Sequence, residues 1–165
     1  MSVLVFSPIS FFNRRRYIIS RDGAKVGEID CAILGEKAGI TIGSASYTAA
    51  REGFMSGAFF LAANGNRLVS AEKLSAFHRQ FTVRSGSRTF TLSATAAFGR
   101  AYEISENEAH AGAITRQSFF SQKFNAELPD DLPLEVKAFL VWLVILLVRR
   151  QRRAAAGAAV AASAR

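Results

Sequence analysis

From Arg16 to Leu128, hydrophobic and polar residues alternate in short segments that are separated by turns. In residues 89–94, TFTLSA, every second side chain is apolar, and residues 80–84, QFTVR, repeat the pattern. A period of two places the apolar side chains on one face of a β-strand. The interruptions are residues that favour hairpin turns, namely Asp22-Gly23, Asn64-Gly65-Asn66 and Ser85-Gly86-Ser87. The pattern predicts about ten to twelve short strands.

Two of these segments, 85 residues apart, resemble each other. RRYIISRDGAKVGEI begins at Arg15 and RAYEISENEAHAGAI begins at Arg100, and seven of the fifteen aligned positions are identical without a gap. Each segment has the pattern of a strand, a turn and a second strand with a glycine two residues before an isoleucine. The similarity is either a general likeness between hairpins or a true repeat. A repeated hairpin favours a meander that closes into a barrel.

Ala138 to Val148 form an uninterrupted apolar run of eleven residues near the C-terminus. As a helix this run would be roughly 16 Å long, about half the hydrocarbon thickness of a bilayer. A helix that is apolar on every face has to be surrounded, and a barrel of about twelve strands has an interior that needs filling. We therefore predict a mainly β protein, a closed antiparallel β-barrel of about twelve short strands around one C-terminal hydrophobic α-helix. A tail-anchored membrane protein that uses residues 138–148 is the alternative.

The 165 residues, half of them hydrophobic, are typical of a single domain. We expect residues 1–10 to be an N-terminal segment, residues 11–153 to form the barrel with its helix at about 133–151, and the Ala-rich residues 154–165 to be disordered. Asp130 or Asp131 is expected to cap the helix, and the arginines after Val148 are expected to match its C-terminal dipole.

The net charge of +8 is unevenly distributed. Five of the 21 Lys and Arg residues follow Val148, where the sequence contains no Asp or Glu, so the rest of the chain is nearly balanced. This distribution argues against specific nucleic-acid binding by a broad basic face. The candidate contacts for an anionic ligand are two arginine clusters: Arg14, Arg15 and Arg16, and Arg149, Arg150, Arg152 and Arg153. Each is either a lipid-phosphate contact or a solvated, structural group.

The sequence contains no pattern that predicts catalysis, a metal or a cofactor. His78 and His110 are far apart and lack acidic partners at ligand spacing. Cys31, the only cysteine, lies in an expected strand, and a single cysteine is typical of a reducing compartment. Residues 1–16 place apolar residues before the positive charge and include Pro8, which is unlike a secretory signal. We expect a non-enzymatic protein of the cytoplasm.

RRRYIISRDGAKVGEI at Arg14, the Gly-x-Ile at Gly27 and Gly112, and LPDDLPLEVKAFLVWLVILL at Leu128 carry a resemblance to a known family. Together they are similar to the tubby C-terminal-like superfamily, which includes the tubby proteins, the phospholipid scramblases and the plant LURP-one-related proteins. The likeness is closest to small bacterial members. It implies a twelve-stranded barrel around a central helix and, in some branches, binding to membrane lipids. The basic constellation of tubby proteins and the calcium-binding features of scramblases have no counterpart in these residues.

Residues and resemblance together predict a binding or scaffold barrel that engages membrane lipid headgroups, or another anionic ligand, through its basic ends. Such a protein would act in the cytoplasm, peripherally at the membrane. A protein–protein scaffold or regulator with no lipid role remains a further alternative.

Overall fold

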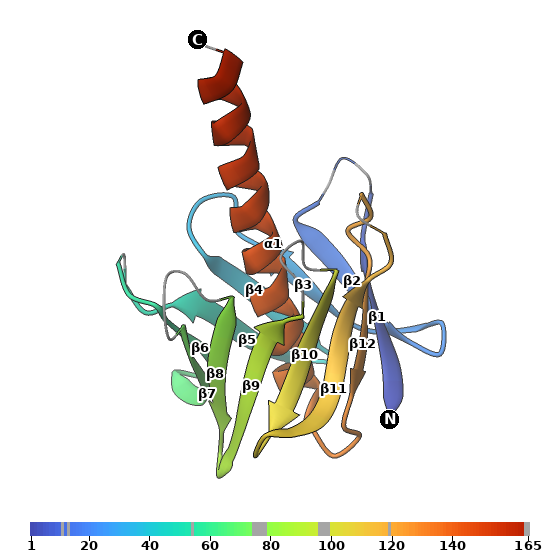
Figure 1. Ribbon diagram of the computed structural model, residues 1–165. Coiled ribbons are helices and arrows are strands. Elements are labelled where there is room, and N and C mark those ends of the chain that lie inside the picture. The colour runs from blue at the N-terminus through green and yellow to red at the C-terminus, as the bar shows by residue number, and fades with distance from the viewer. Residues whose placement is uncertain are drawn as a thin grey trace.

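The structure, a computed structural model, describes residues 1–10, 12, 14–53, 55–73, 79–95, 100–118 and 120–163. Over these ranges the chain forms twelve β-strands and one α-helix (Figure 1). The elements are β1 (Ser2–Pro8), β2 (Arg16–Arg21), β3 (Ala24–Cys31), β4 (Lys37–Ile42), β5 (Ala45–Arg51), β6 (Ala58–Ala63), β7 (Asn66–Lys73), β8 (Gln80–Ser85), β9 (Arg88–Ala94), β10 (Ala101–Glu106), β11 (Ala109–Arg116), β12 (Phe124–Leu128) and α1 (Leu134–Ser163).

The strands form one closed antiparallel barrel. Each strand pairs with its neighbours along the chain, and β1 closes the barrel by pairing with both β2 and β12. In these two pairings Phe6 of β1 lies opposite Ile19 and Phe124. The predicted fold, a closed barrel of about twelve strands with one C-terminal helix, is confirmed.

The alternation of apolar and polar residues places one set of side chains inside the barrel. Phe81, Val83, Phe90 and Leu92 are all fully buried, and the polar residues between them are not. The turns are also those that the sequence predicts: Asp22-Gly23 and Asn64-Gly65 each have two consecutive positive φ angles, of 50° and 79° and of 51° and 80°. Consecutive positive φ angles match the right-handed twist of a two-residue hairpin.

Helix α1 supplies the core of the barrel. Thirteen consecutive residues, from Val136 to Val148, are buried. Trp142 lies at the centre of an aromatic cluster: Phe139 stacks on it with ring centroids 5.7 Å apart, and Phe59 of β6 meets it edge-on at 5.9 Å. Because the helix is apolar on all sides, its burial requires the enclosing sheet. Within the described residues, no helix has the length and apolar character needed to cross a membrane.

The helix is longer than expected. It continues to Ser163 and projects from the barrel, so residues 154–163, which we expected to be disordered, are helical and exposed (Figure 1). Alanine has the highest helix propensity, and the segment contains no proline that would end the helix. The arginines at 149–153 consequently lie within the helix and do not match its C-terminal dipole.

Asp130 and Asp131 lie before the helix but do not cap it. Asp130 accepts a hydrogen bond from the backbone N–H of Ser2 at 2.7 Å and pairs with the amino group of Met1 at 3.1 Å. These interactions lower the pKa of Asp130 to about 2. Asp131 forms an ion pair with an arginine of β9. The helical hydrogen bonds begin with the N–H groups of Val136 and Lys137, which donate to the carbonyl oxygen of Pro133.

The barrel contains a threefold repeat of a four-strand unit. The hairpins β2–β3 and β10–β11, whose sequences resemble each other, have the same burial pattern at every position. The structure adds β6–β7 as a third copy, because the register shifts at the equivalent steps, after Ile19, Leu61 and Ile104. The units are β2–β5, β6–β9 and β10–β12 completed by β1. In this alignment Ala38, Phe81 and Phe124 are equivalent, because each lies opposite the last residue of the preceding strand.

Candidate functional site: a basic end of the barrel

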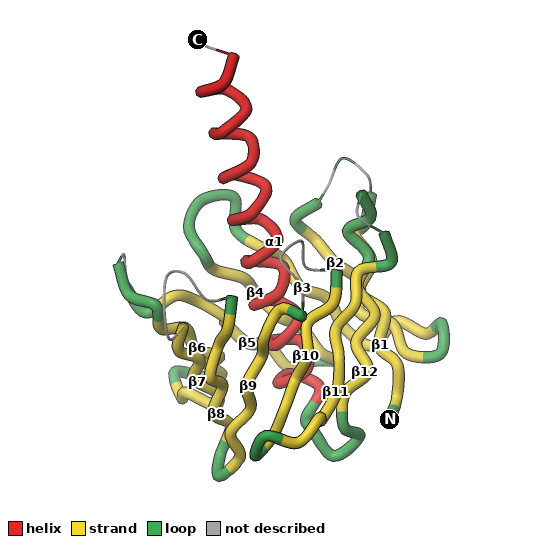
Figure 2. Tube along the Cα trace, in the orientation of Figure 1, coloured by secondary structure: helices red, strands yellow, loops and turns green. Residues whose placement is uncertain are grey.

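The longer connections between strands lie at the end of the barrel from which α1 projects (Figure 2). They follow β1, β3, β5, β7, β9 and β11, whereas two-residue turns follow β2, β4, β6, β8 and β10 at the opposite end. We call the first the helix-exit end. Because the strands are antiparallel and adjacent, segments distant in sequence, such as the connections after β1 and β11, become neighbours here.

Arg150 of α1 is held at this end by Glu36 of the β3–β4 connection. Two guanidinium nitrogens of Arg150 donate to the two carboxylate oxygens of Glu36, each at 2.6 Å, and Arg51 approaches the same carboxylate at 3.4 Å. Burial alone would raise the pKa of Glu36, but the hydrogen bond and charge of Arg150, together with Arg51, bring this pKa below its ordinary value. The bidentate pair fixes the direction in which the helix leaves the barrel.

Arg149 joins the helix to the β1–β2 connection. Its Nη2 donates to the carbonyl oxygen of Arg14 at 2.9 Å. The neighbouring side chains of Tyr17 and Cys31 are buried, and burial raises the pKa of Tyr17 to about 12 and that of Cys31 to about 11. Cys31, which lies at the end of β3, is therefore a neutral thiol near pH 7. A neutral buried thiol is unsuited to nucleophilic chemistry.

Arg116, the last residue of β11, brings a further positive charge into this end of the barrel. It is only 7% exposed, and its Nη2 donates to the carbonyl oxygen of Ser121 at 3.2 Å. Burial, followed by the positive charge of Arg152, lowers the pKa of Arg116. Lys73, at the end of β7, is in a similar position: burial and then the charge of Arg150 lower its pKa. Cations that perturb one another in this way create a field that attracts anions.

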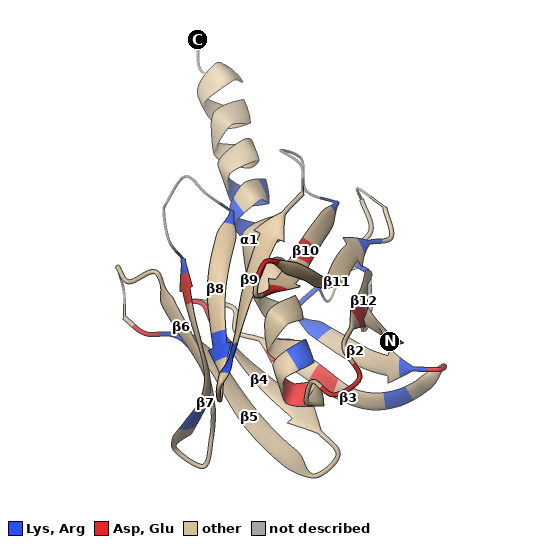
Figure 3. Ribbon diagram, turned by 60° about the horizontal axis from the view of Figure 1, so that its bottom comes forward, with Lys and Arg blue, Asp and Glu red and all other residues tan. Residues whose placement is uncertain are grey.

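These groups define the basic end, which consists of Arg14, Arg15, Lys73, Arg116, Arg149, Arg150, Arg152 and Arg153. From residue 149 to residue 163 the helix contains no Asp or Glu. Figure 3 accordingly shows a band of basic residues on the helix where it leaves the barrel and no acidic residue on the part that projects. The basic end therefore surrounds the base of an exposed helix with guanidinium groups.

Six of the seven arginines singled out from the sequence lie at the basic end. Arg16, the first residue of β2, is not counted among them because it is paired: its Nη2 lies 2.8 Å from Glu28 and its Nε 3.9 Å from Asp30, both on the neighbouring strand β3. Sequence reasoning missed Lys73, Arg116 and Glu36. The position of Arg116 could have been predicted. In residues 112–116, GAITR, it lies two residues after Ile114, so the period of two places both side chains on the inner face of the strand.

Exposed apolar side chains surround the basic end. Phe12, Leu34 and Phe120 are 94%, 87% and 86% exposed, and they come from three different connections at the helix-exit end. With Met55 of the β5–β6 connection, the exposed large apolar residues in the described parts of four helix-exit connections are Ile9, Phe12, Ile33, Leu34, Met55 and Phe120. Large apolar groups gathered on one surface mark an interaction site more often than scattered ones do.

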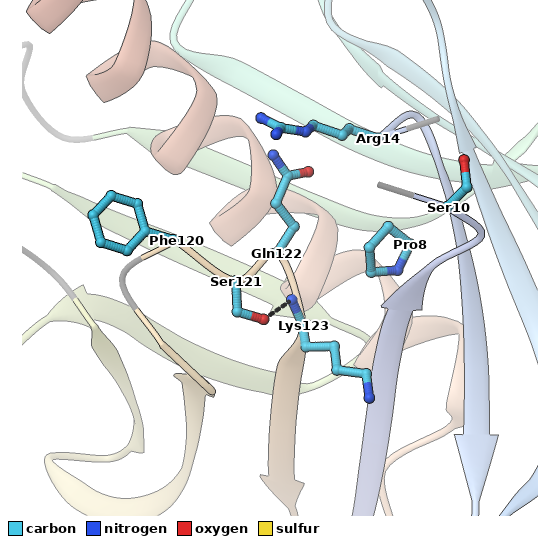
Figure 4. A pocket seen from close by; sticks show the side chains of 7 residues that line it. All are labelled: Pro8, Ser10, Arg14, Phe120, Ser121, Gln122 and Lys123. Atoms are coloured by element: carbon cyan, nitrogen blue, oxygen red, sulfur yellow. Dashed lines mark hydrogen bonds between the residues drawn. The ribbon is translucent and has the colours of Figure 1, made fainter. Parts of the chain in front are cut away.

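A cavity of about 430 Å³ opens beside the helix, between the β1–β2 and β11–β12 connections (Figure 4). Its lining is Pro8, Ser10, Arg14, Phe120, Ser121, Gln122 and Lys123. The amide oxygen of Gln122 accepts a hydrogen bond from the hydroxyl of Tyr17 at 3.1 Å, which anchors the wall of the cavity to the barrel. The lining thus combines two cations and several hydrogen-bond donors with apolar surface.

His110 is not part of this site. His110 Nδ1 lies 3.0 Å from Glu103 Oε1 on an exposed part of the β10–β11 hairpin, and His78 lies outside the described residues. In the described ranges, no group of three or more His, Cys, Asp and Glu side chains is arranged to hold a metal ion.

No protein-family model, curated protein or solved structure matches this chain. The class is therefore defined by the fold alone: a closed twelve-stranded antiparallel barrel with a C-terminal helix.

Proposed function

We propose that the protein is a non-enzymatic barrel that binds the surface of anionic membranes with its helix-exit end. The observation that carries this proposal is the coincidence of two surfaces. The guanidinium groups of the basic end and the exposed apolar side chains of four connections lie at the same end of the barrel. At a membrane interface, lipid phosphates can bind the guanidinium groups, and the region below the headgroups can bury the exposed apolar side chains.

The energetics favour a peripheral mode of binding. A basic residue close to an anionic leaflet contributes about 1 kcal/mol, so Arg149, Arg152 and Arg153 supply a substantial part of the attraction, whereas the charge of Arg150 is compensated by Glu36. Exposed Phe, Leu and Met side chains strengthen binding further when they are buried in the headgroup region. The proposal also includes membership of the tubby C-terminal-like superfamily and action in the cytoplasm, supported by a barrel that encloses a C-terminal apolar helix.

Sedimentation with lipid vesicles tests the proposal. The full chain is mixed with phosphatidylcholine vesicles that contain or lack phosphatidylglycerol, at low and high ionic strength. We expect binding only with the anionic lipid and weaker binding at high ionic strength, because salt screens exposed charges. Replacing Arg152 and Arg153 by Gln is expected to reduce partitioning by roughly tenfold or more.

The matched control changes the same number of charges at the opposite end of the barrel. Lys25→Gln with Arg84→Gln removes two exposed cations that pair with Glu28 and Glu72. We expect this variant to bind vesicles like the unmodified protein. Equal losses in both double variants, or equal binding to neutral vesicles, would refute a docking surface at the basic end.

A further inference from the structure

We propose that Arg51 and Arg150 form a phosphate-binding site at the helix-exit end, and that the carboxylate of Glu36 occupies this site until a lipid phosphate replaces it. Glu36 is then an internal competitor that weakens the binding of anionic ligands. This inference rests on the proposed function and assigns one site, and its regulation, within it.

The contacts of the Glu36 carboxylate are those of an anion in a binding site. Arg150 donates to both of its oxygens, through Nε and Nη2, at 2.6 Å each, and Nη1 of Arg51 lies 3.4 Å from Oε2. Guanidinium groups bind phosphate in the same bidentate manner as carboxylate. A phosphate group offers more oxygen atoms and more negative charge than a carboxylate, so it can bind both arginines at least as well.

Several positive charges act on this carboxylate. Burial raises the pKa of Glu36, and the bidentate contact with Arg150 lowers it. The charges of Arg51 and Arg153 lower this pKa further. Lys73 belongs to the same group, because burial and the charge of Arg150 lower its pKa, whereas the charge of Glu36 raises it. The group of four cations and one carboxylate is therefore positively charged as a whole and attracts a further anion.

The Glu36 side chain can leave this site while the barrel stays unchanged. The carbonyl oxygen of Glu36 accepts a hydrogen bond from the N–H of Arg51 at 3.0 Å. The N–H of Ala32 donates to the carbonyl oxygen of Lys37 at 2.8 Å. These hydrogen bonds hold the main chain at both ends of the β3–β4 connection, so only the side-chain torsions of Glu36 have to change. The side chain is 17% exposed and therefore already borders water.

The threefold repeat indicates that the strands do not need a carboxylate at this place. In the alignment of the three units, the equivalent of Glu36 is Arg79 in the second unit and Gln122 in the third. Those units form the same pairs of strands with a cation or a neutral amide there. The charge of Glu36 therefore serves the contact with Arg150, and Glu36→Gln introduces a side chain that the third unit itself contains.

The β3–β4 connection links this site to the exposed apolar side chains. Ile33 and Leu34, which are 68% and 87% exposed, lie three and two residues before Glu36. Burial of Leu34 in the headgroup region brings Glu36 close to the lipid phosphates. The phosphates are then at a high effective concentration next to Arg51 and Arg150, which favours replacement of the carboxylate.

Sedimentation of the full chain with phosphatidylglycerol-containing vesicles tests the internal competitor. Glu36→Gln is expected to bind at least about fivefold more tightly than the unmodified protein, because the site is no longer occupied. The matched control, Glu72→Gln, removes the same charge from an exposed ion pair with Arg84 and should change binding by no more than about twofold. Glu36→Gln with Arg51→Gln restores the net charge but removes one arginine of the site, so it should lose the gain.

Thermal unfolding, followed by circular dichroism, tests the site without a membrane. Inorganic phosphate, compared with chloride at equal ionic strength, should raise the unfolding midpoint of Glu36→Gln by about 2–4 °C more than that of the unmodified protein. Glu72→Gln should respond to phosphate like the unmodified protein. An equal shift in all three proteins would overturn the proposed site.

The vesicle results separate this inference from the proposed function. Equal gains for Glu36→Gln and Glu72→Gln would show that net charge alone acts, and weaker binding by Glu36→Gln would show that its pair with Arg150 only orients the helix. Either result would overturn the competitor and leave the proposed function standing. A gain that persists after Arg51→Gln would overturn the role of Arg51. Absence of vesicle binding by every variant would reject the proposed function, and a selective phosphate shift of Glu36→Gln would then assign the site to free phosphate.

Discussion

Gly27 and Gly112 occupy equivalent positions in β3 and β11, and each lies directly against the backbone of the next strand. A Cβ atom at Gly27 would be 2.6 Å from the carbonyl oxygen of Thr41, and one at Gly112 would be closer still to the carbonyl oxygen of Glu127. In β7 the equivalent residue is Val69, whose side chain is buried. The first and third units of the barrel therefore need glycine for a close approach of strands, whereas the second unit packs the Val69 side chain at the same place.

Gly27→Ala is expected to lower the free energy of unfolding by about 1–3 kcal/mol, because β3 and β4 have to separate to admit the methyl group. Gly112→Ala should have a similar effect on β11 and β12. Urea unfolding followed by circular dichroism measures both. Gly39→Ala is the matched control: it lies in β4 with no atom near the position of a Cβ, so a change within about 0.5 kcal/mol is expected. An equal loss in the control would show that the close contacts are not responsible.

The fold was predictable because its two signals are local. Period-two alternation identifies strands such as β8 and β9, and the apolar run from Ala138 to Val148 identifies the core helix without knowledge of its partners. The third hairpin was not found, because β6–β7 aligned on β2–β3 shares little beyond the turn glycine, Gly23 with Gly65. What the units share is the burial pattern and the register shift, and register is visible only once the strands are paired.

The candidate site was predictable only in part, for the same reason. The helix arginines are close together in the sequence, and they remain close together in the folded protein. The ion pair of Arg16 could not be predicted because its partner Glu28 lies on a different strand, and only the pairing of β2 with β3 brings the two together. Glu36 is a single acid in a connection, and nothing in its sequence neighbourhood indicates that it meets Arg150, which is 114 residues away.

Trp142 is expected to be the most sensitive position of the core helix. Trp142→Ala would leave a cavity between Phe59 and Phe139 and should lower the free energy of unfolding by about 3–5 kcal/mol. Because Trp142 is the only tryptophan, unfolding has to be followed by circular dichroism and not by fluorescence. Val160→Ala, on the exposed part of the same helix, should change stability by less than about 0.5 kcal/mol. A small change in the free energy of unfolding for both variants would contradict the enclosed position of the helix.

Glu36 should make the stability of the helix-exit end depend on pH. The pKa of Glu36 in the folded protein lies below the unfolded value of about 4.3. The contribution of its charge to the free energy of unfolding is therefore fully present above that pH and is lost as the pH falls through the folded pKa. Glu36→Gln is expected to cost about 1–3 kcal/mol near pH 7, because the partly buried Arg150 loses its counter-charge. The difference between the two proteins should shrink below about pH 4.

Urea unfolding at a series of pH values measures this dependence. The control is Glu72→Gln, which removes an exposed ion pair with Arg84 and should cost no more than about 1 kcal/mol at any pH. A difference between Glu36→Gln and the unmodified protein that stays constant from neutral to acidic pH would contradict the assigned role of the Glu36 charge.

The exposed apolar side chains at the helix-exit end should control how deeply the protein enters a membrane. Phe12→Ser with Leu34→Ser is expected to weaken binding to phosphatidylglycerol-containing vesicles by tenfold or more, since burial of each side chain contributes about 1.5–3 kcal/mol when complete. Both residues are almost fully exposed, so the free energy of unfolding should change little. The charge is unaltered, and the residual binding should therefore keep its dependence on ionic strength.

Val3→Ser with Leu68→Ser provides the comparison, because both are exposed apolar residues on strands and not on the helix-exit connections. Vesicle sedimentation of the two double variants, at low and high ionic strength, separates insertion from simple charge attraction. If the strand variant loses as much binding as the connection variant, the apolar groups act through general hydrophobicity. If neither loses binding, attraction between the arginines and the lipid surface is sufficient, and the connections remain in water.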